Sequence, residues 1–323
     1  VLFRSVVTFS RSAAREAVLD LGADDGKIDV SSLAVDPAMA APPDDRDAAA
    51  RRERLGAAGR YLLAVGKDYP HKDLAAAVAA LKGLPPDVTL LVAGARVWHR
   101  PLADGRTLDE TIRRLGVADR VRWIDGASDD DLKALLVGAE ALVYPSHEEG
   151  FGLPPLEAMT LGVPVVTTGS MSIPEVTGDT VWTHEAGDVR GLEAALGRVL
   201  AGGPDVERRV GRARERAGRF TWDACAEGLL ASYRAAAEAG ARRGDAPPRS
   251  AEAMLDMLDV LARHGSRDAS EVAHWKARCA AVEREFRALE EKFRDLRADA
   301  PRWSLRRRLR KIRRALGGGR DPA

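Results

Sequence analysis

Short apolar runs recur along the chain, and segments with the period of a helix separate them. The runs are four to six residues long, the length of strands buried on both faces of a sheet, and lie at 60–65, 88–93, 121–124, 141–144 and 163–167. Apolar periodicity and boundary residues predict helices between them, at about 72–82, 108–115 and 132–137. Such alternation is typical of an α/β fold with a doubly wound parallel sheet.

The pattern continues on both sides of these runs. Before them, we expect a strand at 6–9, a helix at 11–21 that Ser10 caps and Gly22 ends, and an apolar run at 28–33. After them, we expect helices at about 189–201, 205–218 and 220–239. The segment 38–57 is rich in Ala, Asp and Arg, and we interpret it as a flexible connection without a helix.

The loop and helix after the run at 141–144 carry the strongest boundary signals. Pro154 and Pro155 stand where a helix would begin, and Gly162 stands just past its expected end. The loop contains Gly150 and Gly152, which lack a Cβ and let backbone N–H groups approach a ligand closely. Amides and a helix N-terminus together favour a phosphate or diphosphate.

Charged residues flank this predicted anion site. Glu149 precedes the helix and Glu157 lies in its first turns, with seven residues between them, so both carboxylates can face a ligand that carries hydroxyl groups. Lys67 and Lys72 follow Gly66 at the end of another predicted strand and form a second anion site. Spacing alone leaves open that these four charges are simply solvated.

The longer motif around Glu149 and Glu157 favours a ligand site over solvated charges. The stretch Pro-Ser-His-Glu-Glu-Gly-Phe-Gly-Leu-Pro-Pro-Leu-Glu-Ala-Met at 145–159 closely resembles the signature of the retaining glycosyltransferases of family 4, the "glycosyl transferases group 1" of GT-B architecture. The resemblance implies that the α/β domain is Rossmann-like and forms the C-terminal half of a GT-B fold. Its function would be to transfer a sugar, with retention, from a nucleotide-diphosphate sugar to a glycan or lipid-linked acceptor in cell-envelope polysaccharide synthesis.

Site residues follow from the same resemblance. It implies that Glu149 holds donor-sugar hydroxyls, Glu157 holds the ribose, and Lys67 and Lys72 bind the diphosphate, so that Glu149, Lys72 and Lys67 act in catalysis. Lysine at 67, where the family often has arginine, keeps the charge but loses bidentate geometry. Further donor contacts are implied for Gly66, Gly94, Gly150, Phe151, Gly152 and Leu153.

No cofactor or metal is expected. The acids after Ser128 could suggest a metal site, but Ser128 with Asp131 three residues later is better explained as a helix-capping pair. Similarly, Glu175 lies in a loop that resembles a family passage, and we expect it to be structural rather than catalytic. A phosphorylase or epimerase remains an alternative, as does a nucleotide-sugar-binding or membrane-interaction module without activity.

The resemblance also sets the expected domain organisation. Residues 1–37 resemble the end of an N-terminal, acceptor-side Rossmann domain, and 38–239 would bind the donor. The chain starts at Val1 rather than Met, so we expect an N-terminally truncated fragment that is inactive by itself. In relatives the helix that begins near 220 crosses back onto the N-terminal domain, and here we expect it to have little to cross onto.

The C-terminal part has a different pattern. A linker at 240–250 precedes a helical segment at 251–299, where apolar heptads over 271–297 favour a coiled coil and a homo-oligomer, or a single helix packed on the globular part. The tail at 300–323 predicts a basic amphipathic helix, and its residues 302–316 favour an anionic membrane surface. A solvated helix is the alternative, and nucleic acid is an unlikely partner.

Net charge, cysteine content and the lack of targeting signals limit the partners and the cellular location that we expect. A net charge of +1 over 323 residues gives no overall field for a polyanion, and two distant cysteines, Cys225 and Cys279, do not form a disulfide framework. No signal peptide and no run of eighteen apolar residues is visible. We therefore expect a cytoplasmic protein that is peripheral on the inner face of the membrane where its tail binds.

Overall fold

The computed structural model describes residues 6–96, 102 and 105–241. The predicted coiled coil at 251–299, the tail at 300–323 and nearly all of the linker at 240–250 lie outside the described residues. No helix within the described ranges has the length and apolarity needed to cross a membrane.

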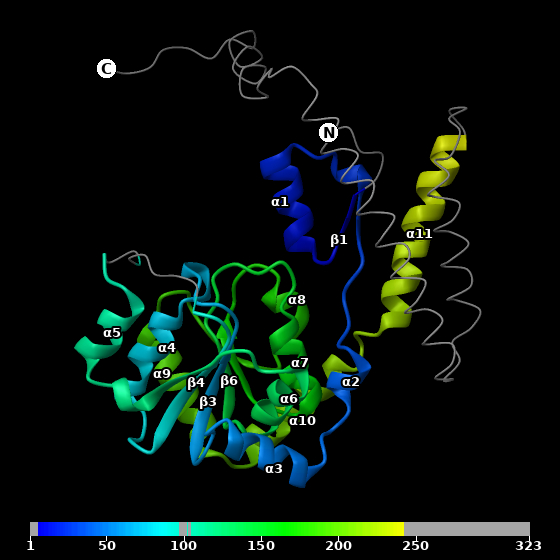
Figure 1. Cartoon of the computed structure of the whole chain (residues 1–323). Helices are drawn as coiled ribbons and strands as arrows, with labels where there is room; N and C mark the ends of the chain where they lie inside the picture. The colour runs from blue at the N-terminus through cyan, green and yellow to red at the C-terminus, as the bar shows by residue number, and fades with distance from the viewer. Residues whose placement is uncertain (1–5, 97–101, 103–104, 242–323) are drawn as a thin grey trace, which may run out of the picture. The chain divides into compact units, whose positions relative to one another are not determined.

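Six parallel strands form the central sheet (Figure 1). They are β3 (Arg60–Val65), β4 (Val88–Ala93), β5 (Val121–Ile124), β6 (Ala141–Tyr144), β7 (Val165–Thr168) and β8 (Trp182–His184). Their order in the sheet is β5-β4-β3-β6-β7-β8, which is the strand order of a Rossmann fold. The predicted doubly wound parallel sheet is therefore confirmed.

Helices cover both faces of this sheet. One face packs against α4 (Leu74–Ala80), α5 (Leu108–Leu115) and α9 (Val189–Ala201). The other packs against α6 (Asp129–Gly138), α7 (Leu153–Leu161), α8 (Ile173–Thr177) and α10 (Pro204–Ala217). Successive strand residues point to opposite faces, so Leu62 enters the first of these two cores and Leu63 the second. This is why the strands are apolar throughout rather than alternating.

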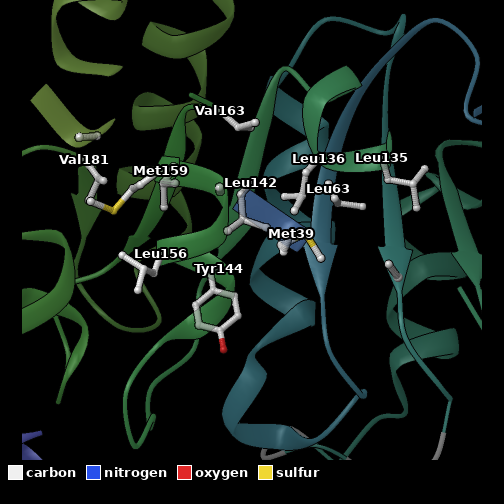
Figure 2. Close-up of a cluster of buried hydrophobic side chains, with 14 of the residues drawn as sticks. Met39, Leu63, Leu135, Leu136, Leu142, Tyr144, Leu156, Met159, Val163 and Val181 are labelled. Carbon is white, nitrogen blue, oxygen red and sulfur yellow. The ribbon is translucent and has the colours of Figure 1, made fainter. Parts of the chain in front are cut away.

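Figure 2 shows the second core, in which Leu63 and Leu142 of the sheet lie among Leu136 and Met159 from the covering helices. Tyr144 lies at the edge of this cluster, and its hydroxyl group points away from the other labelled side chains. The ring is therefore part of the core, while the hydroxyl group faces the end of the sheet.

Several predicted elements have different boundaries, such as α6, which begins at Asp129 rather than at 132, and two of the differences have a clear local cause. The strand expected at 163–167 begins at Val165, because the N–H of Val163 bonds to the carbonyl of Ala158 at the end of α7 and Pro164 has no N–H. The helix expected at 72–82 is divided into a 3₁₀ turn at Pro70–Lys72, α4, and a 3₁₀ turn at Leu81–Gly83. Asp73 separates the first two, because its φ of 44° is left-handed.

The prediction of a flexible connection at 38–57 is wrong. This segment contains α3 (Asp45–Arg54), preceded by α2 (Pro37–Ala40). Asp44 caps α3, Ala48 is the buried residue of the helix, and Arg51 pairs with Asp131 of α6. The apolar face of α3 consists mainly of alanines, so its stability depends on contacts with α6 that an apolar pattern does not reveal.

At the N-terminus, β1 (Val6–Thr8) pairs in parallel with β2 (Ile28–Val30), and α1 (Arg11–Leu21) connects them. The predicted cap at Ser10 and the glycine end at Gly22 are both present. The last described helix, α11 (Trp222–Ala241), packs against β2, and Ser31 donates a 2.9 Å hydrogen bond to the carbonyl of Cys225. The helix therefore crosses onto the short β1–β2 segment, and the structure does not contradict the expectation that it has little to cross onto.

Candidate functional site

The strand order reverses between β3 and β6, and we call the region outside the carboxyl ends of these two strands the crevice. These strands are neighbours, but the chain continues from β3 to β4 on one side and from β6 to β7 on the other. The connecting helices α4 and α7 accordingly cover opposite faces of the sheet. Ligands of open α/β sheets bind at such a reversal, outside the carboxyl ends of the strands. Gly66 and the loop at 145–152 both follow strands that end here.

Lys72, Tyr144 and Glu149 form a triangle of hydrogen bonds at this crevice. Lys72 Nζ lies 2.6 Å from Glu149 Oε1 and 2.8 Å from the Tyr144 hydroxyl oxygen, and that hydroxyl group lies 2.7 Å from the same carboxylate oxygen. The side chains of Lys72 and Glu149 are only 17% and 14% exposed. Two of the sequence-predicted residues are therefore in direct contact, although they are far apart in the sequence.

Tyr144 is a site residue that sequence reasoning missed. Burial raises the pKa of its hydroxyl group well above the usual range, and the negative charges of Glu149 and Glu157 raise it further. The hydroxyl group is therefore protonated at neutral pH and donates to Glu149. The available signal was its position as the last residue of a buried strand, where side chains face the ligand edge of the sheet.

Glu157 lies on α7 and is half-buried. Burial raises the pKa of its carboxyl group, and the charge of Asp129 adds to this effect. Its charge is also the smallest of the causes that raise the pKa of Tyr144. Within the described ranges its carboxylate has no hydrogen bond or ion pair.

Lys67 is not part of this triangle. Its side chain is exposed and forms no ion pair with any described residue. It directly follows Gly66, so it lies at the rim of the crevice beside the end of β3. Its predicted contact with a diphosphate remains a prediction.

Gly66 and Gly94 let the ends of β3 and β4 approach closely. A Cβ on Gly94, where φ is 158°, would collide with the carbonyl oxygen of Gly66. A Cβ on Gly66 would meet the side chain of Lys72 at 3.4 Å. Gly94 therefore has a packing role, and Gly66 is favoured by its φ of 129°, while the contacts of both with the donor remain predictions.

The loop from Gly150 to Leu153 has, within the described part of the chain, four backbone amides without partners at the start of α7. Gly152 precedes the helix with a φ of 107°, and no side chain caps the first turn. The N–H groups of Gly150, Phe151, Gly152 and Leu153 donate to no acceptor among the described residues. Amides without partners beside an uncapped helix N-terminus form a concave site for an anion.

The two loops of the crevice are joined to each other. The carbonyl oxygen of His71 accepts hydrogen bonds from the N–H of His147 at 2.8 Å and from the hydroxyl group of Ser146 at 3.0 Å. The ring of His147 lies 2.9 Å from the carboxylate of Asp73. Asp73 is next to Lys72, so these contacts fix the backbone of both loops on either side of the Lys72–Glu149 pair.

The predicted capping pair of α6 is confirmed. Ser128 accepts from the N–H of Asp131, and Asp131 accepts from the N–H of Ser128. The carboxylate of Asp131 also pairs with Arg51 and Arg54. Over the part of the chain that the structure describes, no group of three or more His, Cys, Asp or Glu residues is placed to hold a metal.

A hollow of about 740 Å³ lies beside the crevice, over α4 and α5. His71, Asp73, His147 and Glu148 line its end, but neither Lys72 nor Glu149 does. We place the candidate site in the crevice rather than in this hollow, because the crevice has the charged pair, the unpartnered amides and the reversal of strand order.

Comparison with known families gives one match over most of the α/β region. The model of the family described as "Glycosyl transferases group 1" matches residues 45–216, which is more than half of the chain. The match contains the six strands and the candidate site.

Curated relatives are similar over more of the chain. It is 37% identical over 231 residues to a D-inositol 3-phosphate glycosyltransferase of Segniliparus rotundus, covering 68% of this chain and 49% of the relative. It is 32% identical over 178 residues to the O-antigen chain mannosyltransferase B of Escherichia coli, covering 54% and 45%. The chain thus spans about half the length of these relatives.

Solved structures share the fold. The Anabaena protein Alr3699/HepE, in complex with UDP and glucose, superposes with a TM-score of 0.60 at 21% identity, covering 67% of this chain and 59% of that one. A sucrose-phosphate synthase from Thermosynechococcus elongatus gives 0.59 at 26% identity, covering 73% and 59%. These likenesses agree with the Rossmann-like sheet order.

Proposed function

Because the chain belongs to the glycosyl transferases group 1 family, we propose that it supplies the donor-binding half of a retaining glycosyltransferase. The enzyme would transfer a sugar from a nucleotide-diphosphate sugar to a glycan or lipid-linked acceptor. The name of the O-antigen relative supports a glycan acceptor and a role in cell-envelope polysaccharide synthesis. The observation that carries the proposal is the Lys72–Glu149 pair beside the unpartnered amides of the 150–153 loop.

Lys72 supplies a positive charge and the loop amides supply hydrogen-bond donors, and a diphosphate requires both. A lysine ammonium group has three donors, and Lys72 uses two of them for Tyr144 and Glu149, so one remains for a phosphate oxygen. As the sugar leaves, negative charge grows on the diphosphate, and fixed donors stabilise this charge without reorganising. Lys67 at the rim adds positive charge from the solvent side.

The two carboxylates suit the hydroxyl groups at the ends of such a donor. Ionised carboxylates only accept hydrogen bonds, so Glu149 orients the sugar and the unpaired Glu157 holds the ribose. With no side chain assigned as a nucleophile, the departing phosphate oxygen takes the proton of the acceptor hydroxyl group. The acceptor oxygen then attacks the same face of the sugar that the diphosphate leaves, and the configuration is retained.

Calorimetry with the 323-residue chain tests the donor assignment. We expect one of UDP, GDP and ADP to bind, and we expect Lys72→Ala to weaken that binding at least about tenfold, roughly 1.4 kcal/mol. Lys82→Ala is the matched control, because Lys82 is exposed beyond the far end of α4 and should leave binding unchanged. If all three nucleotides fail to bind, or if both lysine variants behave alike, the proposed function is wrong.

A second variant separates the sugar from the diphosphate. Glu149→Gln removes the negative charge that pairs with Lys72 but keeps the size of the side chain. We expect it to lower the affinity for the nucleotide sugar while leaving the affinity for the free nucleoside diphosphate equal or higher. Equal loss of both affinities would contradict the assignment of Glu149 to the sugar.

A further inference from the structure

Two buried serines hold three consecutive carbonyl groups of the candidate anion loop. The hydroxyl oxygen of Ser172 lies 2.6 Å from the carbonyl oxygen of Glu149 and 3.0 Å from that of Phe151. It has one proton, so the two carbonyls share a single donor. The hydroxyl group of Ser10 donates to the carbonyl between them, that of Gly150, at 2.8 Å.

These contacts set the direction of the loop amides. In a trans peptide unit the C=O of one residue and the N–H of the next point in opposite directions within one plane. Turning the carbonyls of 149–151 toward the serines therefore turns the N–H groups of 150–152 away from them. These same N–H groups have no acceptor among the described residues.

Both serines are themselves fixed in place. Ser172 is 0% and Ser10 is 1% exposed. Ser10 also accepts a 3.0 Å hydrogen bond from the N–H of Ala13, as the cap of α1. Neither hydroxyl group can therefore turn to solvent without losing a buried hydrogen bond.

A third contact anchors α1 itself. The carboxylate of Glu175 accepts hydrogen bonds from the N–H groups of Arg11 and Ser12, each at 2.8 Å. Arg216 in turn donates to the backbone carbonyl of Glu175 at 2.7 Å. Ser10 is thus connected, through α1 and α8, to α10, which covers the same face of the sheet as α7.

We propose that Ser172 and Ser10 are positioning residues for the donor diphosphate, because their hydroxyl groups turn three successive loop amides toward it. The proposal rests on the proposed function and adds to it the residues that prearrange the anion site. Donors that are already oriented need not be ordered when the ligand binds, so they increase affinity. The serines act on the diphosphate alone and have no role toward the nucleoside.

Calorimetry with the full chain tests this inference. The probes are the nucleoside diphosphate that binds tightest among UDP, GDP and ADP, and the corresponding nucleoside. We expect Ser172→Ala to weaken the diphosphate by about tenfold and the nucleoside by less than about twofold, since only the diphosphate contacts the amides. Ser10→Ala should change the two affinities in the same unequal way.

Thr180→Ala is the matched control. Thr180 is also buried, and its hydroxyl group donates to the carbonyl of Thr177 at 2.7 Å, outside the anion loop. It should leave the ratio of diphosphate to nucleoside affinity unchanged. Thermal unfolding identifies any variant that does not fold, and if Ser172→Ala fails, Ser10→Ala and Glu175→Gln decide the question.

The outcomes separate the two proposals. If no nucleoside diphosphate binds the unaltered chain, the proposed function is wrong and this inference with it. If the diphosphate binds and the folded serine variants retain its affinity, or lose diphosphate and nucleoside affinity equally, only the positioning role is overturned.

Discussion

The hydroxyl group of Tyr144 connects the two charges of the candidate site. Its oxygen is within hydrogen-bond distance of both Lys72 and Glu149, while its ring belongs to the core. A single side chain therefore relates the packing of the sheet to the geometry of the charged pair. Because the ring is buried, the position of its hydroxyl group is fixed, and this restricts the conformations of Lys72 and Glu149.

Tyr144→Phe tests this connection, because it keeps the ring and removes the hydroxyl group. We expect nucleoside diphosphate affinity to fall by about threefold to tenfold, corresponding to one hydrogen bond of about 1 kcal/mol. Calorimetry measures the effect. Tyr61→Phe is the control, since its buried hydroxyl group donates to the carbonyl of Leu135, away from the crevice. Equal effects of the two changes would assign the loss to packing.

Glu157 makes the stability of the protein depend on pH. Burial raises the pKa of its carboxyl group above the ordinary 4.5, so the folded state binds this proton more tightly than the unfolded state does. Its contribution to stability is fully present below pH 4.5 and is lost as pH rises through the raised pKa. At neutral pH the buried charge therefore costs stability, which its proposed contact with a ribose would explain.

The corresponding prediction concerns Glu157→Gln. We expect this variant to have a higher Tm than the unaltered chain at pH 8, and the difference to shrink at pH 4.5 and below, because glutamine has no charge to bury. Thermal unfolding across this range measures it. A Tm difference that is the same at every pH would show that the charge of Glu157 does not matter. Reduced nucleotide affinity of the same variant would support the ribose contact.

At the scale of elements, Asp73 joins the two loops of the crevice. One carboxylate oxygen caps α4 through the N–H of Ala76 at 3.2 Å, and the other lies against the ring of His147. The residue does this from a left-handed backbone conformation, which Asp and Asn tolerate better than other residues with a Cβ. The start of α4, and with it Lys72, is therefore set by one side chain.

Asp73→Asn and Asp73→Ala distinguish these contributions. Asparagine keeps the cap and the left-handed conformation and loses only the carboxylate charge beside His147, so we expect a change of less than about 1 kcal/mol in the free energy of unfolding. Alanine also loses the cap and the tolerated conformation, so we expect a loss of about 2 kcal/mol. Urea denaturation measures both, and equal losses would contradict the capping role.

The elements also show how far the sequence could be used. The strands β3 to β7, α5 and α7 were predicted well, because apolar runs and boundary residues are local signals. The strand β8 was missed, because it is only three residues long. The helix α3 was missed, because arginine contacts with α6 stabilise it and its apolar residues are nearly all alanines. The break at Asp73 was missed as well, since helix propensity does not reveal a left-handed residue.

The candidate site was also predicted only in part, because the sequence shows local motifs but not tertiary contacts. The motif identified Lys72 and Glu149, and the structure brings them into contact. Ser172 and Ser10 could not be assigned, because their contacts with loop carbonyls depend on how α1 and α8 meet the loop. A motif can identify residues by their side-chain chemistry. Serines that orient a distant backbone segment can be identified only once the structure is known.

At the scale of the whole molecule, the segment before residue 38 is integrated with the α/β domain. It contacts the anion loop through Ser10 and α8 through α1, and it contacts α11 through Ser31. Trp222 of α11 also donates to the carbonyl of Val35 at 3.0 Å. We therefore expect changes in this segment to affect donor binding, as the serine variants test.

Two helix N-termini meet at this edge of the sheet, and within the described ranges only one of them lacks an acceptor for its amides. The amides of α1 are already neutralised by the carboxylate of Glu175, whereas those before α7 have no such counter-charge. The carboxylate of Glu175 thus occupies the N-terminus of α1, where a dissolved anion would otherwise bind. Inorganic phosphate or sulfate should accordingly bind before α7 rather than at α1, and it should compete with the nucleotide for that site.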